Sequence, residues 1–289
     1  ATATAPAIAT AVGCWLLLDR IPQPKPRLAL TACLTVLVCI SLACGLPVTP
    51  EPDEPSACEI TVDGMYSLIL ELEFPQHFNA VDDQQVVRQG DEFDVNQYFS
   101  VLTSLSMEPG YTLDYVYDAI GGNGSPVLYA RPEDQERYAT FSEYEKTFAG
   151  MANETKWALI QQGYLAHVIP ADTEEGYFQM AVLHLLGDQF YLQWHANYDD
   201  DIVVCDQGHL EKALADYVEW IADHDPDDDK DILRGVKNLS LEPEVILKED
   251  VAQVSLVYFT KWGGVFRVTY EISRQQPHTI VEIKQENLY

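Results

Sequence analysis

Apolar and polar residues alternate in several short runs of this chain, and these runs predict β-strands. In residues 66–74, leucine and phenylalanine side chains alternate with Glu71 and Glu73. Alternation over about four to eight residues is typical of a strand with one buried face. We therefore expect residues 60–74 to open the folded part of the chain as a strand, with a helix as the alternative.

Similar runs on either side of turn-forming residues predict β-hairpins. Residues 111–117 and 127–130 flank a Gly-Gly-Asn-Gly sequence and predict a first hairpin. A second hairpin is expected around Gly187 and Asp188, because this turn places three apolar pairs on one face of the sheet. Those pairs are Leu185 with Phe190, Leu183 with Leu192, and Ala181 with Trp194.

A third hairpin is predicted in the C-terminal part of the chain, with Gly263 and Gly264 as its turn. The expected neighbours across the two strands are Phe259 with Val268 and Val257 with Tyr270. A last strand at residues 279–284 would complete an antiparallel meander.

Helix signals separate these hairpins. Asp94 and Asp206 are suitable N-caps, Pro132 suits the first position of a helix, and residues 142–145 match a capping box at which that helix restarts. The expected helices cover residues 94–105, 132–148, 154–166 and 207–222. Hairpins and helices together predict an α+β fold, an antiparallel sheet and meander with several helices packed on it.

A basic patch followed by an apolar run stands near the start of the sequence. Lys25 and Arg27 precede 16 residues, 28–43, that carry no charge, and Cys44 follows. A membrane-spanning helix needs about 20 apolar residues, so the run is short for a permanent span. The pattern favours a signal segment, with an uncleaved anchor or a signal peptide cut elsewhere as alternatives.

The end of this run, Ser41-Leu-Ala-Cys44, resembles the lipobox of bacterial lipoproteins, although Ser41 stands where that family favours leucine. The resemblance covers only residues 25–44. It implies that Cys44 is lipidated and becomes the new N-terminus. The protein would then be exported and anchored through lipid to the outer face of a bacterial membrane, in the cell envelope.

Composition divides the chain into four parts. Residues 1–24 read as an upstream extension outside the fold, and residues 25–44 as the signal segment. Residues 45–57 are rich in proline and acids and read as an extended tether. Residues 58–289 would form the α+β domain, with two lobes and a break near 223–231 as an alternative.

Charge and cysteine usage narrow the classes of partner and compartment. After Cys44 the chain holds 14 basic and 45 acidic residues, a net charge of −31. Such a domain is unsuited to nucleic acid, which is bound by neutralising phosphates, and it admits cationic or small-molecule ligands. Only two of the six cysteines, Cys58 and Cys205, follow Cys44. In an exported protein they are expected to form a disulfide.

An acidic run near residue 225 is a candidate calcium site, because calcium takes about six to eight oxygen ligands. The candidate ligands are Asp223, Asp225, Asp227 and Asp229. The run is not an EF-hand, since Asp228 and Arg234 replace the turn glycine and the closing glutamate. A solvated acidic linker is the alternative interpretation.

A polar face of the second predicted hairpin is a candidate site for a small ligand or sugar. Its residues are Tyr191, Gln193, His195, Asn197 and Asp199. The alternative is an ordinary water-facing sheet surface, which is normally polar.

The sequence favours a binding or interaction module over an enzyme. It contains no Gly-x-Ser-x-Gly elbow, and the glycines at 121–124 are not followed by the Lys-Ser/Thr of a phosphate loop. No cofactor is expected apart from calcium at the acidic run. The alternatives are a calcium-binding or calcium-stabilised surface module and a hydrolase whose carboxylates meet only in the fold.

Overall fold

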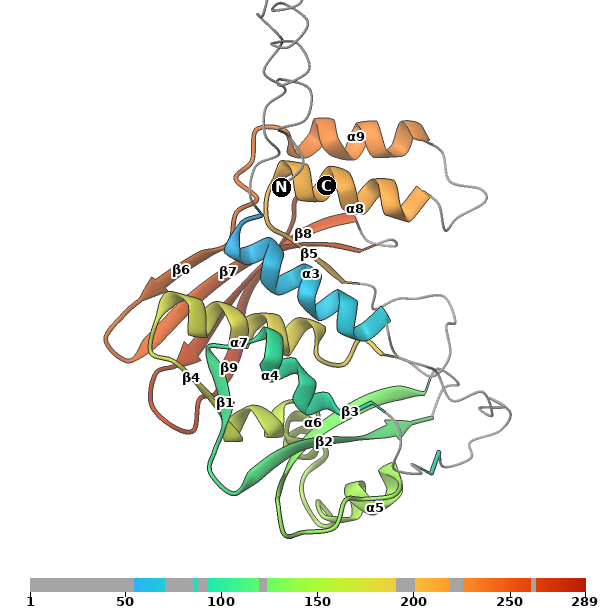
Figure 1. The fold of residues 1–289 in the computed structure, drawn as a ribbon, viewed down its shortest axis with the longest axis vertical. Helices are drawn as coiled ribbons and strands as arrows, with labels where there is room; N and C mark the ends of the chain where they lie inside the picture. Colours follow the sequence, from blue (N-terminus) through green and yellow to red (C-terminus); the bar gives the residue numbers. More distant parts are fainter. Residues whose placement is uncertain are drawn as a thin grey trace, which may run out of the picture. The chain divides into compact units, whose positions relative to one another are not determined.

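The computed structural model describes residues 55–70, 86–87, 93–119, 124–190, 201–218, 226–260 and 264–289 (Figure 1). All of them belong to one compact unit, Pro55–Tyr289. Helices and antiparallel sheets both contribute, so the predicted α+β class is confirmed. Among the described residues, no helix combines the length and the apolar character needed to cross a membrane.

The largest sheet is antiparallel and has five strands. They are β5 (Ile202–Val204), β6 (Glu244–Leu247), β7 (Val251–Thr260), β8 (Gly264–Ser273) and β9 (Ile280–Asn287). The order is β5-β7-β8-β9, and β6 pairs with β7 beside β5. Strand β9 confirms the predicted last strand at 279–284.

Helices cover both faces of this sheet. On one face, α3 (Ala57–Leu70) and α7 (Glu174–Leu186) pack against Leu256 and its neighbours in one hydrophobic core (Figure 1). On the other, α8 (Gln207–Val218) and α9 (Pro226–Val236) pack against Val257 and Phe259. The end of β7 is therefore buried on both sides, which removes the alternation that the sequence argument relied on.

The predicted register of the C-terminal hairpin is wrong by three residues. Thr260 pairs with Gly264, so Phe259 lies opposite Val265 and Val257 opposite Arg267. Alternation pins a register only where one face of a strand is buried and the other is exposed. The two-sided burial of β7 made several registers look equally good in the sequence.

The hairpin predicted around Gly187 and Asp188 is also wrong, because residues 174–186 form the helix α7. The helix is buried on nearly all sides, so it shows no polar face to reveal its 3.6-residue period. Its real start signal is Thr173, whose Oγ1 accepts a hydrogen bond from the Gly176 amide at 3.1 Å.

The described part of the chain begins with helix α3, where a strand was the favoured prediction. Ser56 and Glu59 form a reciprocal capping box: Ser56 Oγ accepts from the Glu59 amide at 3.2 Å, and Glu59 Oε2 accepts from the Ser56 amide at 2.7 Å. The predicted disulfide is confirmed, since Cys58 in α3 is bonded to Cys205 ahead of α8. The predicted cap of α8 is confirmed as well, because Asp206 Oδ1 accepts from the His209 amide at 2.7 Å.

A second region is built on the predicted first hairpin, which is confirmed as β2 (Tyr111–Asp118) paired with β3 (Ser125–Pro132). One face of the hairpin packs against α5 (Phe141–Lys146) and α6 (Asn153–Gln162). The 3-10 turn η2 (Gly163–His167) continues α6. The predicted helix at 154–166 therefore corresponds to α6 followed by this 3-10 turn.

Two helix boundaries differ from the prediction in this region. Residues 132–140 are not helical, because β3 runs to Pro132, and α5 starts at Phe141 with Thr140 as its cap. The helix expected at 94–105 ends early. Asp94 does cap η1 (Val95–Gln97), but α4 (Tyr98–Val101) stops and Leu105 already lies in β1 (Leu105–Met107). Strand β1 pairs with β4 (Val168–Pro170), a long-range contact that competes with the local helix signal.

Candidate ligand-binding site

Most residues predicted as sites lie outside the part of the chain that the structure describes. These are Cys44, Asp223, Asp225, Tyr191, Gln193, His195, Asn197 and Asp199. Asp227 and Asp229 belong to the helix α9. Within the described ranges, no three His, Cys, Asp or Glu side chains come together as a metal site.

A cavity of about 250 Å³ lies where the end of β3 meets α5, α6 and η2. The residues that line it are Ala130, Arg131, Gln135, Tyr138, Tyr144, Thr147, Phe148, Leu159, Gly163, Tyr164 and His167. Ligand pockets for drug-sized molecules measure about 300–1,000 Å³, so this cavity suits a smaller molecule. A smaller cavity of about 170 Å³ is also lined by Tyr164, together with Asp118, Trp157 and other residues.

Local sequence signals shape the cavity wall that α5 provides. Thr140 Oγ1 accepts from the Glu143 amide at 3.3 Å, and Glu143 Oε2 accepts from the Ala139 amide at 2.9 Å. These two bonds fix the first turn of α5. Gly150, with φ of +86°, then reverses the chain between α5 and α6 in a conformation that favours glycine.

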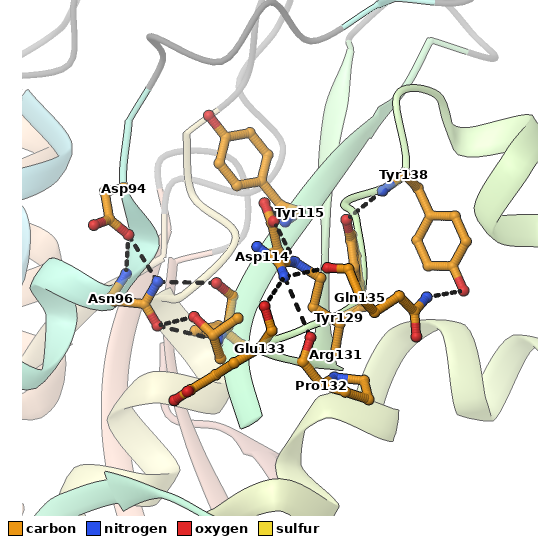
Figure 2. A network of polar contacts seen from close by, with 12 residues as sticks. Asp94, Asn96, Asp114, Tyr115, Tyr129, Arg131, Pro132, Glu133, Gln135 and Tyr138 are labelled. Atoms are coloured by element: carbon orange, nitrogen blue, oxygen red, sulfur yellow. Dashed lines mark hydrogen bonds and ion pairs between the residues drawn. The ribbon is translucent and has the colours of Figure 1, made fainter. Parts of the chain in front are cut away.

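Arg131 is held rigidly at the rim of the cavity (Figure 2). Its Nε donates to Asp114 Oδ2 at 2.9 Å, and its Nη1 donates to backbone carbonyls, the shortest bond going to Gln135. Asp114 is itself oriented, since its Oδ1 accepts from the Tyr115 amide at 3.0 Å. Among the described residues no acceptor reaches Arg131 Nη2, which leaves this donor for a ligand.

The strand that carries Asp114 is braced from the side by Asn96 (Figure 2). The Asn96 side chain donates to the Leu113 carbonyl and accepts from the Leu113 amide, both at 3.0 Å. Asp94 Oδ1 in turn accepts from the Asn96 amide and side chain. The side-chain amide thus pairs with β2 as another strand would, and it holds the Arg131 partner in register.

Aromatic rings form the apolar wall of the cavity. Tyr144 stacks on Tyr129 with 4.9 Å between ring centroids, and Phe148 meets Tyr144 edge to face at 5.1 Å. Tyr138 is fixed by two hydrogen bonds: its amide donates to Tyr129 Oη, and its hydroxyl accepts from Gln135 Nε2, each at 3.0 Å (Figure 2). These contacts give the wall a defined shape.

Tyr144 adds a second unused donor. Only 7% of the residue is exposed, and in the described part of the chain nothing hydrogen-bonds to its hydroxyl. Burial, followed by the neighbouring Tyr138 and Tyr129, raises the pKa of Tyr144 above its usual value. The hydroxyl therefore keeps its proton across the physiological range and is able to donate it in a hydrogen bond.

His167 closes the cavity at the end of η2. Its Nδ1 lies 2.7 Å from Glu108 Oε2, and its ring stacks on Tyr111 at 4.0 Å between centroids. A carboxylate-oriented histidine resembles the base of a catalytic triad. However, the one aliphatic hydroxyl among the lining residues, on Thr147, already donates to the Tyr144 carbonyl at 2.7 Å. The arrangement is suited to binding.

The sequence indicated part of this site. Tyr138, Tyr144 and Phe148 recur at helical spacing within the helix expected at 132–148, a pattern that indicates a helix and not a ligand site. Arg131 and His167 were missed, since each depends on a carboxylate partner from a distant segment. The remaining signal was that Arg131 is one of only 14 basic residues after Cys44.

Comparison of the chain with models of known protein families, with curated proteins and with solved structures gives no match in any of the three. The function must therefore be argued from the site itself.

Proposed function

We propose that this protein is an exported, lipid-anchored binding module whose ligand is a small molecule held in the cavity between β3, α5 and η2. The observation that carries the proposal is the cavity itself. It combines aromatic walls with two fixed donors, Arg131 Nη2 and the Tyr144 hydroxyl, to which the described residues supply no acceptor. Concave apolar surface with a few oriented polar groups is the usual composition of a ligand site.

The disulfide supports the part of the proposal that concerns export. Cys58 and Cys205 are bonded, and such bonds persist in oxidising compartments and are rare in the cytosol. Lipidation of Cys44 rests on the resemblance of residues 41–44 to a lipobox. The calcium site stays a prediction, because Asp223 and Asp225 lie outside the described residues. The hydrolase stays a prediction as well.

The binding proposal is tested with the full chain and a library of small fragments, using ligand-observed saturation-transfer NMR. We expect binders whose signal falls in the variant Phe148→Ala, because this change removes one aromatic wall. Trp157→Ala is the matched control, since it removes an aromatic ring that lines only the other cavity. Equal signals in wild type and Phe148→Ala for every binder would refute the site.

The anchor is tested by the intact mass of the protein purified from a bacterial membrane. A mass that starts at Cys44 and includes acyl chains is expected. A mass that includes residues 25–43 would refute cleavage at Cys44, and Cys44→Ala should abolish lipid labelling.

A further inference from the structure

Carboxylates lie beside the nitrogen donors of the cavity, and this restricts the charge of a ligand that could bind there. Arg131 is paired with Asp114, and the two side chains are 20% and 10% exposed, respectively. His167 Nδ1 lies 2.7 Å from Glu108 Oε2. The Arg131 cation thus brings its own carboxylate, and a carboxylate also stands beside the His167 ring. The cavity offers N–H groups without offering net positive charge.

The net charge of the whole chain also disfavours an anionic ligand. The formal net charge is −29, and a field of one sign repels ligands of that sign. A carboxylate or phosphate would be repelled by the protein and would find no uncompensated cation at the site. An uncharged ligand with oxygen acceptors meets neither obstacle.

The aromatic wall supplies the second requirement. Tyr138 and Phe148 line the cavity beside the donors Arg131 and Tyr144. Flat rings bury an apolar surface efficiently, while hydroxyl groups accept hydrogen bonds from N–H and O–H donors. A sugar ring presents both features, an apolar C–H face and a rim of hydroxyls, and it suits a cavity of about 250 Å³.

We infer that the cavity binds the ring of an uncharged sugar, with the C–H face on the aromatic wall and ring hydroxyls on Arg131 and Tyr144. This inference rests on the proposed function, since it names the ligand class of the same site.

The test measures affinities of the full chain for glucose, galactose, mannose and N-acetylglucosamine, and for the anionic analogue glucuronate. We expect at least one neutral sugar to bind more tightly than glucuronate, with an affinity that changes little between 20 and 500 mM NaCl, because screening acts only on charges. Tyr144→Phe should weaken that sugar by about fivefold, the loss of one hydrogen bond. Tyr289→Phe, a change outside the cavity, should leave its affinity unchanged.

A second variant tests charge compensation directly. Glu108 is partly exposed, so Glu108→Gln keeps a hydrogen-bond acceptor beside His167 and removes the carboxylate without a large packing change. We expect glucuronate to gain affinity in this variant and the neutral sugar to stay within about twofold, because no charge on the ligand is involved.

Three results would overturn the inference in distinguishable ways. Tighter binding of glucuronate than of every neutral sugar to the wild type, with strong salt dependence, would refute the ligand class. Binding of fragments but of no sugar would refute the sugar and leave the proposed function standing. No binding of any sugar or fragment would refute both.

Discussion

At the scale of single residues, the electrostatic environment decides what each polar group does. His184 in α7 forms a T-shaped pair with the Tyr270 ring, with centroids 5.2 Å apart. Burial lowers the pKa of His184 from 6.5 to about 4. By contrast Arg131 and His167 line the cavity and have carboxylate partners. One histidine is thus packed within the fold, while another lies at the site.

His184 predicts a loss of stability in mild acid. The folded protein resists protonation of this ring, whereas the unfolded chain takes up the proton near pH 6.5. The free energy of unfolding should therefore fall as pH drops from 6.5 to about 4, by at most about 3 kcal/mol, since each pKa unit corresponds to about 1.4 kcal/mol.

Urea unfolding of wild type and His184→Phe at pH 7 and pH 4.5 checks this. Other groups titrate in both proteins, so the measured quantity is the difference between their pH dependences. We expect the variant to lose less stability than the wild type on acidification. An equal or larger loss in His184→Phe would contradict the argument.

At the scale of elements, close contacts and cross-links select between structures that the local sequence leaves open. Helix α7 begins where Gly176 passes close to the backbone of Ala171: an added Cβ would lie 2.1 Å from the Ala171 carbonyl oxygen. Helix α3 is bound to the segment before α8 by the Cys58–Cys205 disulfide, with 5.7 Å between the Cα atoms. Both features position the helices that cover the sheet.

Gly176→Ala should destabilise the protein by about 1–3 kcal/mol, the usual cost of forcing an extra methyl group into a packed region. The neighbour that must move is backbone, which has no rotamer to change. Gly208→Ala is the matched control, because the nearest atom to its added Cβ is the Asp206 carboxylate at 3.4 Å. Thermal melts that rank the two variants in the opposite order would refute this explanation.

Removal of the disulfide should cost about 5 kcal/mol in the chain-entropy estimate, since the bonded cysteines are 147 residues apart. A loss of that size corresponds to a melting temperature lower by on the order of 10 °C. The measurement is a thermal melt with and without a phosphine reductant. In the double variant Cys58→Ala, Cys205→Ala the reductant should have no effect, and an unchanged wild-type melt under full reduction would contradict the prediction.

At the scale of the whole molecule, the excess of acids governs stability and partners. With a formal net charge of −29, the acidic groups of one folded molecule repel one another and destabilise its compact state. We therefore expect the melting temperature to rise between 10 and 300 mM NaCl, because salt screens this repulsion. A fall over this range would refute the argument.

Calcium chloride at equal ionic strength separates screening from a specific site. A calcium site occupied at 100 times its dissociation constant should add about 2.7 kcal/mol beyond the effect of sodium chloride. Asp223→Asn with Asp225→Asn should remove only that added part. Equal melting temperatures in the two salts would refute the alternative that the protein binds calcium.

Sequence reasoning succeeded where the signal is local. The turn glycines and alternation at 111–130 predicted β2 and β3, and Asp206 predicted the start of α8. The cysteine pairing was also predictable, because only two cysteines follow Cys44. Each of these depends on a few neighbouring residues or on a count.

The failures share a physical cause, which is burial on more than one side. Helix α7 and the end of β7 are enclosed by other elements, so neither shows the polar face from which a period or a register is read. The site was hidden for a related reason. Arg131 is defined by Asp114, which is 17 residues away, and His167 by Glu108, which is 59 residues away.

The sequence by itself therefore determined the α+β class, the first hairpin, the disulfide and the acidic character of the protein, since these follow from local patterns and composition. Only the tertiary structure decided the register of the large sheet, the helical state of α7, and the pairing of Arg131 and His167 with carboxylates. Those features depend on which distant segments pack together, and short-range patterns do not encode that choice.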